Sequence, residues 1–276
     1  MPRFTASDGT KIAYEDAGAG LPVLCLAGLT RTMRDFDFLA PHLEGVRLIR
    51  MDYRGRGKSD WPGPETYTPE QEGADALALL DHLGLERAAI IGTSRGGLIA
   101  MGLAAAARAR LLGVCLNDIG PEIDPGGLDA IMAYLGKPPV IKTLAEAAQL
   151  RAAYMQAVGF EKVPPEVWQR EAGFSYKEIE GGLALRYDAR LREAVEAMAA
   201  APPQDLWPFF RALKGLPTAL IHGKNSNILS AETVAKMRAE YPEMRVAEVP
   251  GRGHVPFLDE PESLAAIRAW IGDMRA

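Results

Sequence analysis

Short runs of apolar residues alternate with longer stretches in which apolar positions recur at helical spacing, up to residue 120 and again after residue 216. The short runs predict buried strands, and the stretches between them predict helices. The predicted strands cover residues 3–6, 11–15, 22–26, 46–51, 87–91, 111–116, 217–221 and 245–249. The predicted helices cover residues 36–43, 69–83, 97–107, 230–241 and 260–274. Because helical crossovers join parallel strands, the pattern predicts an α/β fold with a mostly parallel eight-stranded sheet and helices on both faces.

The strand rhythm stops between residues 121 and 216. Helical segments follow one another there, at residues 128–134, 144–158, 165–173, 189–201 and 206–213. The interval is rich in aromatic residues, among them Tyr134, Tyr154 and Trp168. We therefore expect a core domain formed by residues 1–120 and 217–276, and a helical cap, or lid, formed by residues 121–216. Most of the aromatic side chains should fill the small core of this cap, and a minority should line a pocket.

The composition limits the classes of partner and compartment. Apolar residues make up 48% of the chain, and the formal net charge of −5 argues against nucleic acid or an anionic membrane as a partner. No window approaches the roughly 18 unbroken apolar residues of a membrane helix, and the first residues lack the apolar run of a secretory signal. The two cysteines, Cys25 and Cys115, lie in apolar runs, so we expect buried thiols in a cytoplasmic protein. No metal-ligand or nucleotide-binding spacing occurs, so we expect no metal and no cofactor.

The segment Gly92-Thr93-Ser94-Arg95-Gly96 lies where the predicted strand 87–91 runs into the predicted helix 97–107. A serine in a G-x-S-x-G turn between a strand and a helix is held out above the sheet by a sharp, strained turn. Small residues two positions to either side of the serine prevent steric clashes in that turn. The pattern makes Ser94 a candidate nucleophile.

A serine hydroxyl needs a base to take its proton. His42 and His82 lie inside predicted helices, and His222 ends a predicted strand, so these three are expected to have ordinary packing or surface roles. His254 lies in a loop, Gly251-Arg252-Gly253-His254-Val255, after the last predicted strand and before the last predicted helix. This position makes His254 the candidate base.

With these motifs the chain resembles the α/β-hydrolases, the large group that includes esterases, lactonases, carbon–carbon bond hydrolases and cofactor-free haloperoxidases. The resemblance covers essentially the whole chain. Its motifs are Leu26-Ala27-Gly28-Leu29, the glycine-rich stretch 52–60, Gly92-Thr93-Ser94-Arg95-Gly96, and Gly251-Arg252-Gly253-His254. The resemblance implies a catalytic triad in the chain order serine, acid, histidine. It also implies an oxyanion hole made by the backbone amides of Leu29 and Arg95, each worth about 3–4 kcal/mol in the transition state.

The triad acid is where the sequence departs from the family pattern. The position at which members of the family usually carry an aspartate holds Asn227, and an asparagine cannot compensate the charge of an imidazolium. Three explanations stand side by side. Asp118, after the predicted strand 111–116, supplies the acid; or Asn227 replaces an aspartate and leaves a slow enzyme; or catalysis is lost and the pocket binds a ligand. Asn227 is the preferred occupant of the acid position, with Asp118 close enough to compensate in part.

These observations favour a serine hydrolase that cleaves a small ester, lactone or related acyl compound through an acyl-enzyme, a carboxylic ester hydrolase. The alternatives are a carbon–carbon bond hydrolase and a non-catalytic small-molecule-binding protein on the same fold. Arg31 and Arg34 follow the predicted oxyanion loop and could attract an anionic substrate, but solvated surface arginines are the preferred interpretation.

Overall fold

The computed structural model describes residues 1–275 and contains an eight-stranded sheet with the strand order β1-β2-β4-β3-β5-β6-β9-β10. Its strands are β1 Arg3–Thr5, β2 Lys11–Gly18, β3 Leu21–Leu26, β4 Val46–Met51, β5 Ala88–Thr93, β6 Leu111–Asn117, β9 Thr218–Gly223 and β10 Arg245–Val249. The first hairpin and the β2–β4 pair are antiparallel, and the other pairs are parallel. The predicted fold class is confirmed.

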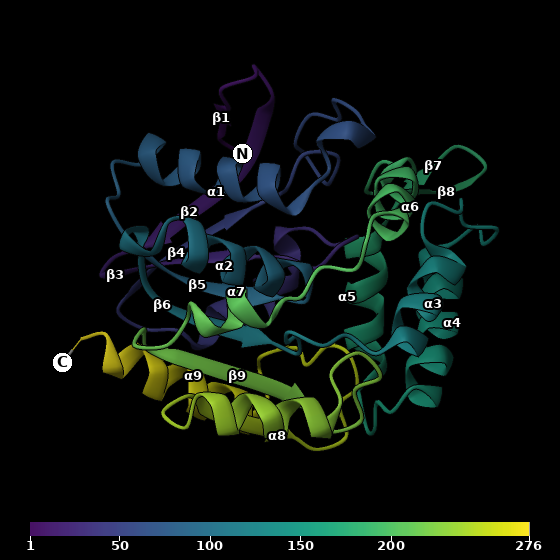
Figure 1. The fold of residues 1–276 in the computed structure, drawn as a ribbon. Coiled ribbons are helices and arrows are strands. Elements are labelled where there is room, and N and C mark those ends of the chain that lie inside the picture. Colours follow the sequence, from purple (N-terminus) through teal and green to yellow (C-terminus); the bar gives the residue numbers. More distant parts are fainter. Residues whose placement is uncertain (276) are drawn as a thin grey trace.

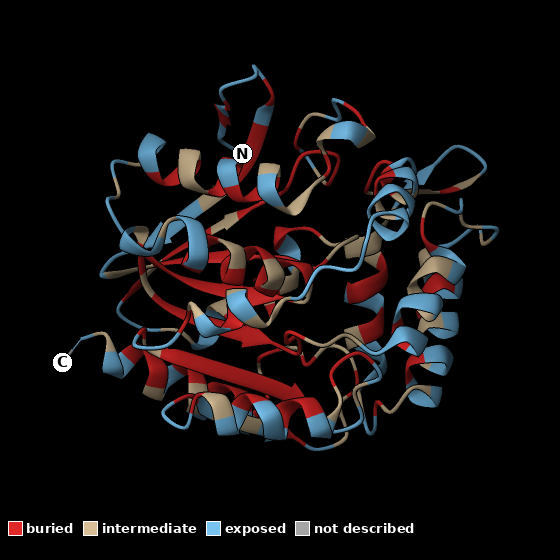
Figure 2. Ribbon diagram, viewed as in Figure 1, coloured by how far each residue is buried: buried red, intermediate tan, exposed pale blue. Residues whose placement is uncertain are grey.

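Helices cover both faces of this sheet. The helices outside residues 121–216 are α1 Pro69–His82, α2 Arg95–Ala106, α8 Ala231–Glu240 and α9 Pro261–Asp273. Residues three apart on a strand point to opposite faces. On β6, a β-carbon added to Gly113 would meet Trp270 of α9, whereas Leu116 lies against Gly97 of α2. The central strands are therefore buried from both sides, as the red ribbons in Figure 2 show. The predicted helix 36–43 is instead two short 3-10 helices, Met33–Asp37 and Ala40–His42.

Residues 121–216 contribute no strand to the main sheet. Their elements are α3 Pro125–Tyr134, α4 Leu144–Ala157, α5 Pro165–Ser175, β7 Tyr176–Ile179, β8 Gly182–Leu185, α6 Leu191–Ala200 and α7 Trp207–Arg211. Elements α3 to α6 gather beside the end of the sheet toward which the β9 arrow points in Figure 1. The β7–β8 hairpin was not predicted, and its sequence signal is the Glu180-Gly181 turn, in which Gly181 has a φ of 83°. The interval is therefore not purely helical.

The aromatic residues of this interval divide between two cores. Phe160 and Trp168 pack with Met155, Ala172 and Leu183 in a small core of their own, as expected. The side chain of Phe210, from α7, belongs instead to the main core, because α7 packs on α2. The predicted cap, residues 121–216, therefore includes one helix, α7, that packs on the main sheet layer.

Cys25 and Cys115 are free and buried, as predicted, and burial raises the pKa of the Cys115 thiol to about 12. Among the described residues, no helix combines the length and apolar character that a membrane crossing requires.

Candidate active site

Ser94 occupies a strained turn between β5 and α2. Its φ of 51° and ψ of −113° lie outside the regions that side chains other than glycine usually adopt. A β-carbon on Gly92 would approach the carbonyl oxygen of Gly96 to 2.4 Å, and one on Gly96 would approach the carbonyl oxygen of Leu26 to 2.0 Å. Only glycine fits at both positions, so the sequence pattern around Ser94 is a steric requirement of the turn.

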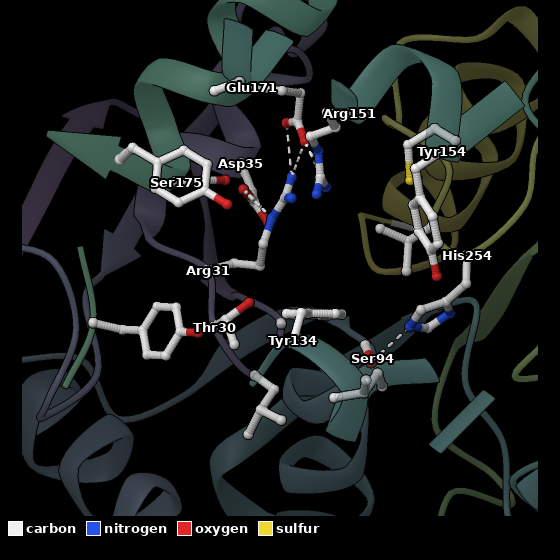
Figure 3. Close-up of a pocket in the computed structure, with 18 of the residues that line it drawn as sticks. Thr30, Arg31, Asp35, Ser94, Tyr134, Arg151, Tyr154, Glu171, Ser175 and His254 are labelled. Atoms are coloured by element: carbon white, nitrogen blue, oxygen red, sulfur yellow. Dashed lines mark hydrogen bonds and ion pairs between the residues drawn. The ribbon is translucent and has the colours of Figure 1, made fainter. Parts of the chain in front are cut away.

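The side chain of His254 joins Ser94 to Asp118. Nε2 of His254 lies 2.9 Å from Oγ of Ser94, and Nδ1 lies 2.8 Å from Oδ2 of Asp118 (the first contact is drawn in Figure 3). An ionised carboxylate can only accept a hydrogen bond, which places the imidazole proton on Nδ1 and leaves Nε2 free to accept the serine proton. The three side chains form one continuous line of hydrogen bonds.

The carboxylate of Asp118 is wholly buried and is held from several sides. Its Oδ1 accepts a hydrogen bond from the backbone amide of Gly223 at 2.8 Å, and its Oδ2 accepts one from Oγ of Ser226 at 2.6 Å. The backbone amide of Asp118 donates to the carbonyl oxygen of Ile221 at 2.8 Å. These contacts fix the carboxylate in the orientation that His254 requires.

The structure does not place Asn227 at the acid position of the triad, which corrects the preferred interpretation of the sequence. Asn227 is exposed, and within residues 1–275 its side chain makes no hydrogen bond to His254. The physical reason is the strand order. Because β6 and β9 are neighbours, Asp118 at the end of β6 reaches His254 directly, and Ser226, next to Asn227, donates to Asp118 instead.

The other histidines lie elsewhere, as expected. Nε2 of His222 faces the carbonyl oxygen of Leu229 at 3.0 Å, and Nε2 of His82 lies 3.1 Å from the hydroxyl of Tyr14. His42 lies in the second 3-10 helix.

The two segments predicted to form an oxyanion hole flank Ser94. Arg95 begins α2, so its amide belongs to the first turn, where amides have no partner within the helix. Leu29 follows β3, and the preceding residue of that loop, Gly28, adjoins the nucleophile: the position of a β-carbon on Gly28 lies 3.9 Å from Cβ of Ser94.

A buried group of charges, Arg56, Glu72 and Arg95, ties these two segments together. Nε of Arg56 donates to the carbonyl oxygen of Leu29 at 3.0 Å, and Nη1 of Arg56 forms an ion pair with Oε1 of Glu72 at 2.7 Å. The other oxygen of Glu72 accepts a hydrogen bond from Nε of Arg95 at 2.6 Å. Burial lowers the pKa of Arg56, and the charge of Glu72 only partly opposes this. Glu72 therefore bridges the side chain that holds the Leu29 loop and the side chain that begins α2.

A cavity of about 620 Å³ opens above Ser94 and His254. One wall comes from the loop after β3, and a second wall comes from residues of the 121–216 interval. Apolar and aromatic side chains dominate that second wall, including those of Ile131, Tyr134, Leu150, Tyr154, Met155 and Tyr187. The cavity is of the size and character that suit a small organic ligand.

One part of the cavity wall is charged. Arg31 donates from Nε to Asp35 at 2.8 Å and from Nη2 to Glu171 at 2.6 Å, and Nη2 of Arg151 donates to Glu171 at 3.2 Å. Burial raises the pKa of Asp35 to about 6, although Arg31 opposes the change. Burial would also raise the pKa of Glu171, but the positive charges of Arg31 and Arg151 bring it below its usual value. These four side chains are called the charged cluster below.

The interpretation of Arg31 as a solvated surface residue is wrong, because its side chain is only 18% exposed and lines the cavity. Arg34 is 52% exposed and pairs with Asp37, as a surface residue does. The sequence could not distinguish the two, since Glu171, one of the two partners of Arg31, lies 140 positions away.

Comparisons with known proteins identify the family of the chain. Residues 23–267 match the alpha/beta hydrolase family, and the chain belongs to that family. It is 37% identical over 270 residues to a 3-hydroxybutyrate-oligomer hydrolase of Cupriavidus necator, covering 92% of this chain and 90% of the relative. It is 28% identical to a 2-(acetamidomethylene)succinate hydrolase of Mesorhizobium japonicum, covering 93% of this chain and 90% of the relative. The crystal structure of an alpha/beta hydrolase from Novosphingobium aromaticivorans superimposes with a TM-score of 0.91 at 41% identity, covering 98% of this chain and 97% of that one.

Proposed function

We propose that this protein is a serine hydrolase that cleaves a small carboxylic ester through an acyl-enzyme. The observation that carries the proposal is the continuous line of hydrogen bonds from Asp118 through His254 to Ser94, at the floor of a largely apolar cavity. A ligand-binding protein has no need of an oriented base beside a strained serine, so the arrangement supports catalysis over binding alone.

In the proposed mechanism, Oγ of Ser94 attacks the ester carbonyl while Nε2 of His254 accepts the serine proton. Asp118 keeps the imidazole in the required tautomer and stabilises the positive charge that forms on it. The backbone amides of Leu29 and Arg95 donate to the oxyanion, each contributing about 3–4 kcal/mol. Collapse of the tetrahedral intermediate expels the alcohol, which takes the proton from His254. Water then attacks the acyl-enzyme by the same route and releases the acid.

The similarity to a 3-hydroxybutyrate-oligomer hydrolase suggests the ester class. Esters of short hydroxy acids are small enough for a cavity of about 620 Å³ and carry an apolar methyl or alkyl branch that suits its aromatic wall.

The test is hydrolysis of p-nitrophenyl acetate, butyrate and octanoate and of the linear dimer of 3-hydroxybutyrate. We expect turnover of the short esters and of the dimer, and loss of turnover in Ser94→Ala. Absence of turnover across the panel in the correctly folded protein, or full turnover by Ser94→Ala, would contradict the proposal.

A further inference from the structure

The charged cluster has no part in the triad chemistry, yet it lines the same cavity. Its members come from three segments: Arg31 and Asp35 follow β3, Arg151 lies on α4, and Glu171 lies on α5. Figure 3 shows the cluster at one end of the cavity, with Ser94 and His254 at the other. A network of this kind holds α4 and α5 to the core, but buried ion pairs contribute little net stability. Two further observations point to a ligand.

The first observation is an unused hydrogen-bond donor. Nε of Arg151 is buried, and among the described residues it finds no acceptor. The side chain of Arg151 otherwise contacts Glu171 through one nitrogen at 3.2 Å, so most of its five donors are left for another partner. A buried donor without an acceptor costs about 1–3 kcal/mol. An acceptor oxygen that enters from the cavity would remove this cost.

The second observation is the sign of the local charge. Besides Arg31 and Arg151, Lys137 lines the cavity, so its wall carries three cations and the two carboxylates of Asp35 and Glu171. The whole chain has a formal net charge of −5, and this excess of positive charge is therefore a property of the cavity.

The cluster also lies within reach of a ligand bound at the nucleophile. The position of a β-carbon on Gly28 lies 3.2 Å from Cγ of Arg31 and 3.9 Å from Cβ of Ser94, so the stem of Arg31 and the nucleophile border the same glycine. From there the side chain of Arg31 extends away from Ser94 to its guanidinium in the cluster (Figure 3). A short chain that begins at Ser94 and follows this stem ends beside Arg151.

We propose that Arg151, supported by Arg31, forms a carboxylate-binding subsite, and that the substrate is an ester that carries a free carboxylate, such as a short hydroxy-acid oligoester. The proposal rests on the proposed function. A guanidinium binds a carboxylate with two parallel hydrogen bonds, and in a partly desolvated cavity these bonds are stronger than on the surface. A monoanion fits better than a dianionic phosphate, because Asp35 and Glu171 lie beside the arginines and repel excess negative charge.

The test compares two p-nitrophenyl esters of matched length, the free-acid monoester of glutaric acid and its neutral counterpart, p-nitrophenyl pentanoate. We expect the protein to favour the acid in kcat/KM by about tenfold or more, and Arg151→Met to remove most of that preference through KM. Arg151→Lys should keep part of it, because the charge remains. Arg34→Met, which removes an exposed arginine outside the cavity, is the matched control and should keep the full preference.

The outcomes separate the two proposals. Equal hydrolysis of both esters by the protein, or a preference unchanged in Arg151→Met, would overturn the subsite and leave the hydrolase intact. Hydrolysis of neither ester would count against the hydrolase. The subsite is then tested by titration calorimetry of glutarate against Ser94→Ala, where we expect binding that Arg151→Met weakens by about tenfold. Absence of glutarate binding to Ser94→Ala would overturn the subsite.

Discussion

The carboxylate of Asp118 accepts a hydrogen bond from Nδ1 of His254 at 2.8 Å, across 136 positions of the sequence. Asp118 directly follows β6, and its φ of 55° turns the chain sharply there. Two neighbouring donors, the amide of Gly223 and the hydroxyl of Ser226, hold the same carboxylate. The carboxylate that His254 contacts therefore lies at a different strand end from the one at which the family pattern places the triad acid.

Asp118→Asn should therefore lower kcat by about 10⁴-fold, because an amide cannot stabilise the imidazolium and would favour the wrong tautomer. Asn227→Asp should change kcat by less than about threefold, since Asn227 is exposed and away from His254. Steady-state kinetics with a short p-nitrophenyl ester measure both. A strong gain of activity in Asn227→Asp would show that Asn227 occupies a vacated acid site after all.

Gly96, in the turn around Ser94, and Gly102 both lie on α2, so alanine substitutions at the two positions form a matched pair. Gly96→Ala should lose activity and about 1–3 kcal/mol of unfolding free energy, because its methyl group would overlap the carbonyl oxygen of Leu26. The methyl group of Gly102→Ala would meet no atom within 4 Å, so this change should stabilise α2 by about 1 kcal/mol. Urea denaturation measures both changes. Equal stability of the two variants would show that the turn can relax around the added methyl.

The bridge formed by Glu72 predicts a positioning role for this residue. Glu72→Gln should weaken the link between Arg56 and Arg95, misplace the oxyanion donors and lower kcat by about tenfold with little change in KM. Affinity for an alkyl boronate, which mimics the tetrahedral intermediate, should fall in parallel. Glu70→Gln, an exposed change on the same helix, is the control. Loss of stability with unchanged boronate affinity would reduce Glu72 to a purely structural residue.

Asp35 gives a pH-dependent prediction. Its pKa is about 6 in the folded protein and 3.8 in the unfolded reference, so the folded protein binds the proton more tightly. Ionisation of Asp35 therefore costs folding free energy as the pH rises from about 4 to about 6, and the cost is complete above that range. Asp35→Asn removes this cost. Its unfolding free energy relative to the parent should rise by as much as ~3 kcal/mol between acidic and neutral pH.

Chemical denaturation at about pH 4 and pH 7.5 measures this change, with the exposed Asp129→Asn as the control. A relative stability that falls as the pH rises would contradict the direction of the Asp35 shift.

Much of the fold could be predicted because the core strands are continuous apolar runs and their helical connections have clear periodicity. Ser94 and His254 could be found because each lies in a local motif whose backbone geometry restricts the sequence. The choice between Asp118 and Asn227 could not be made in the same way, since it depends on the adjacency of β6 and β9. The burial of Arg31 was missed for a related reason, because Glu171, one of its two partners, lies on a helix distant in sequence.

The most direct test of the central claim is identification of the residue that carries the covalent intermediate. The protein is treated with a fluorophosphonate, digested, and its peptides are sequenced by mass spectrometry. We predict one modified residue, Ser94, labelled rapidly in the parent, slowly in His254→Ala, and not at all in Ser94→Ala. Modification of a different residue, or equal labelling of the Ser94→Ala protein, would contradict the account.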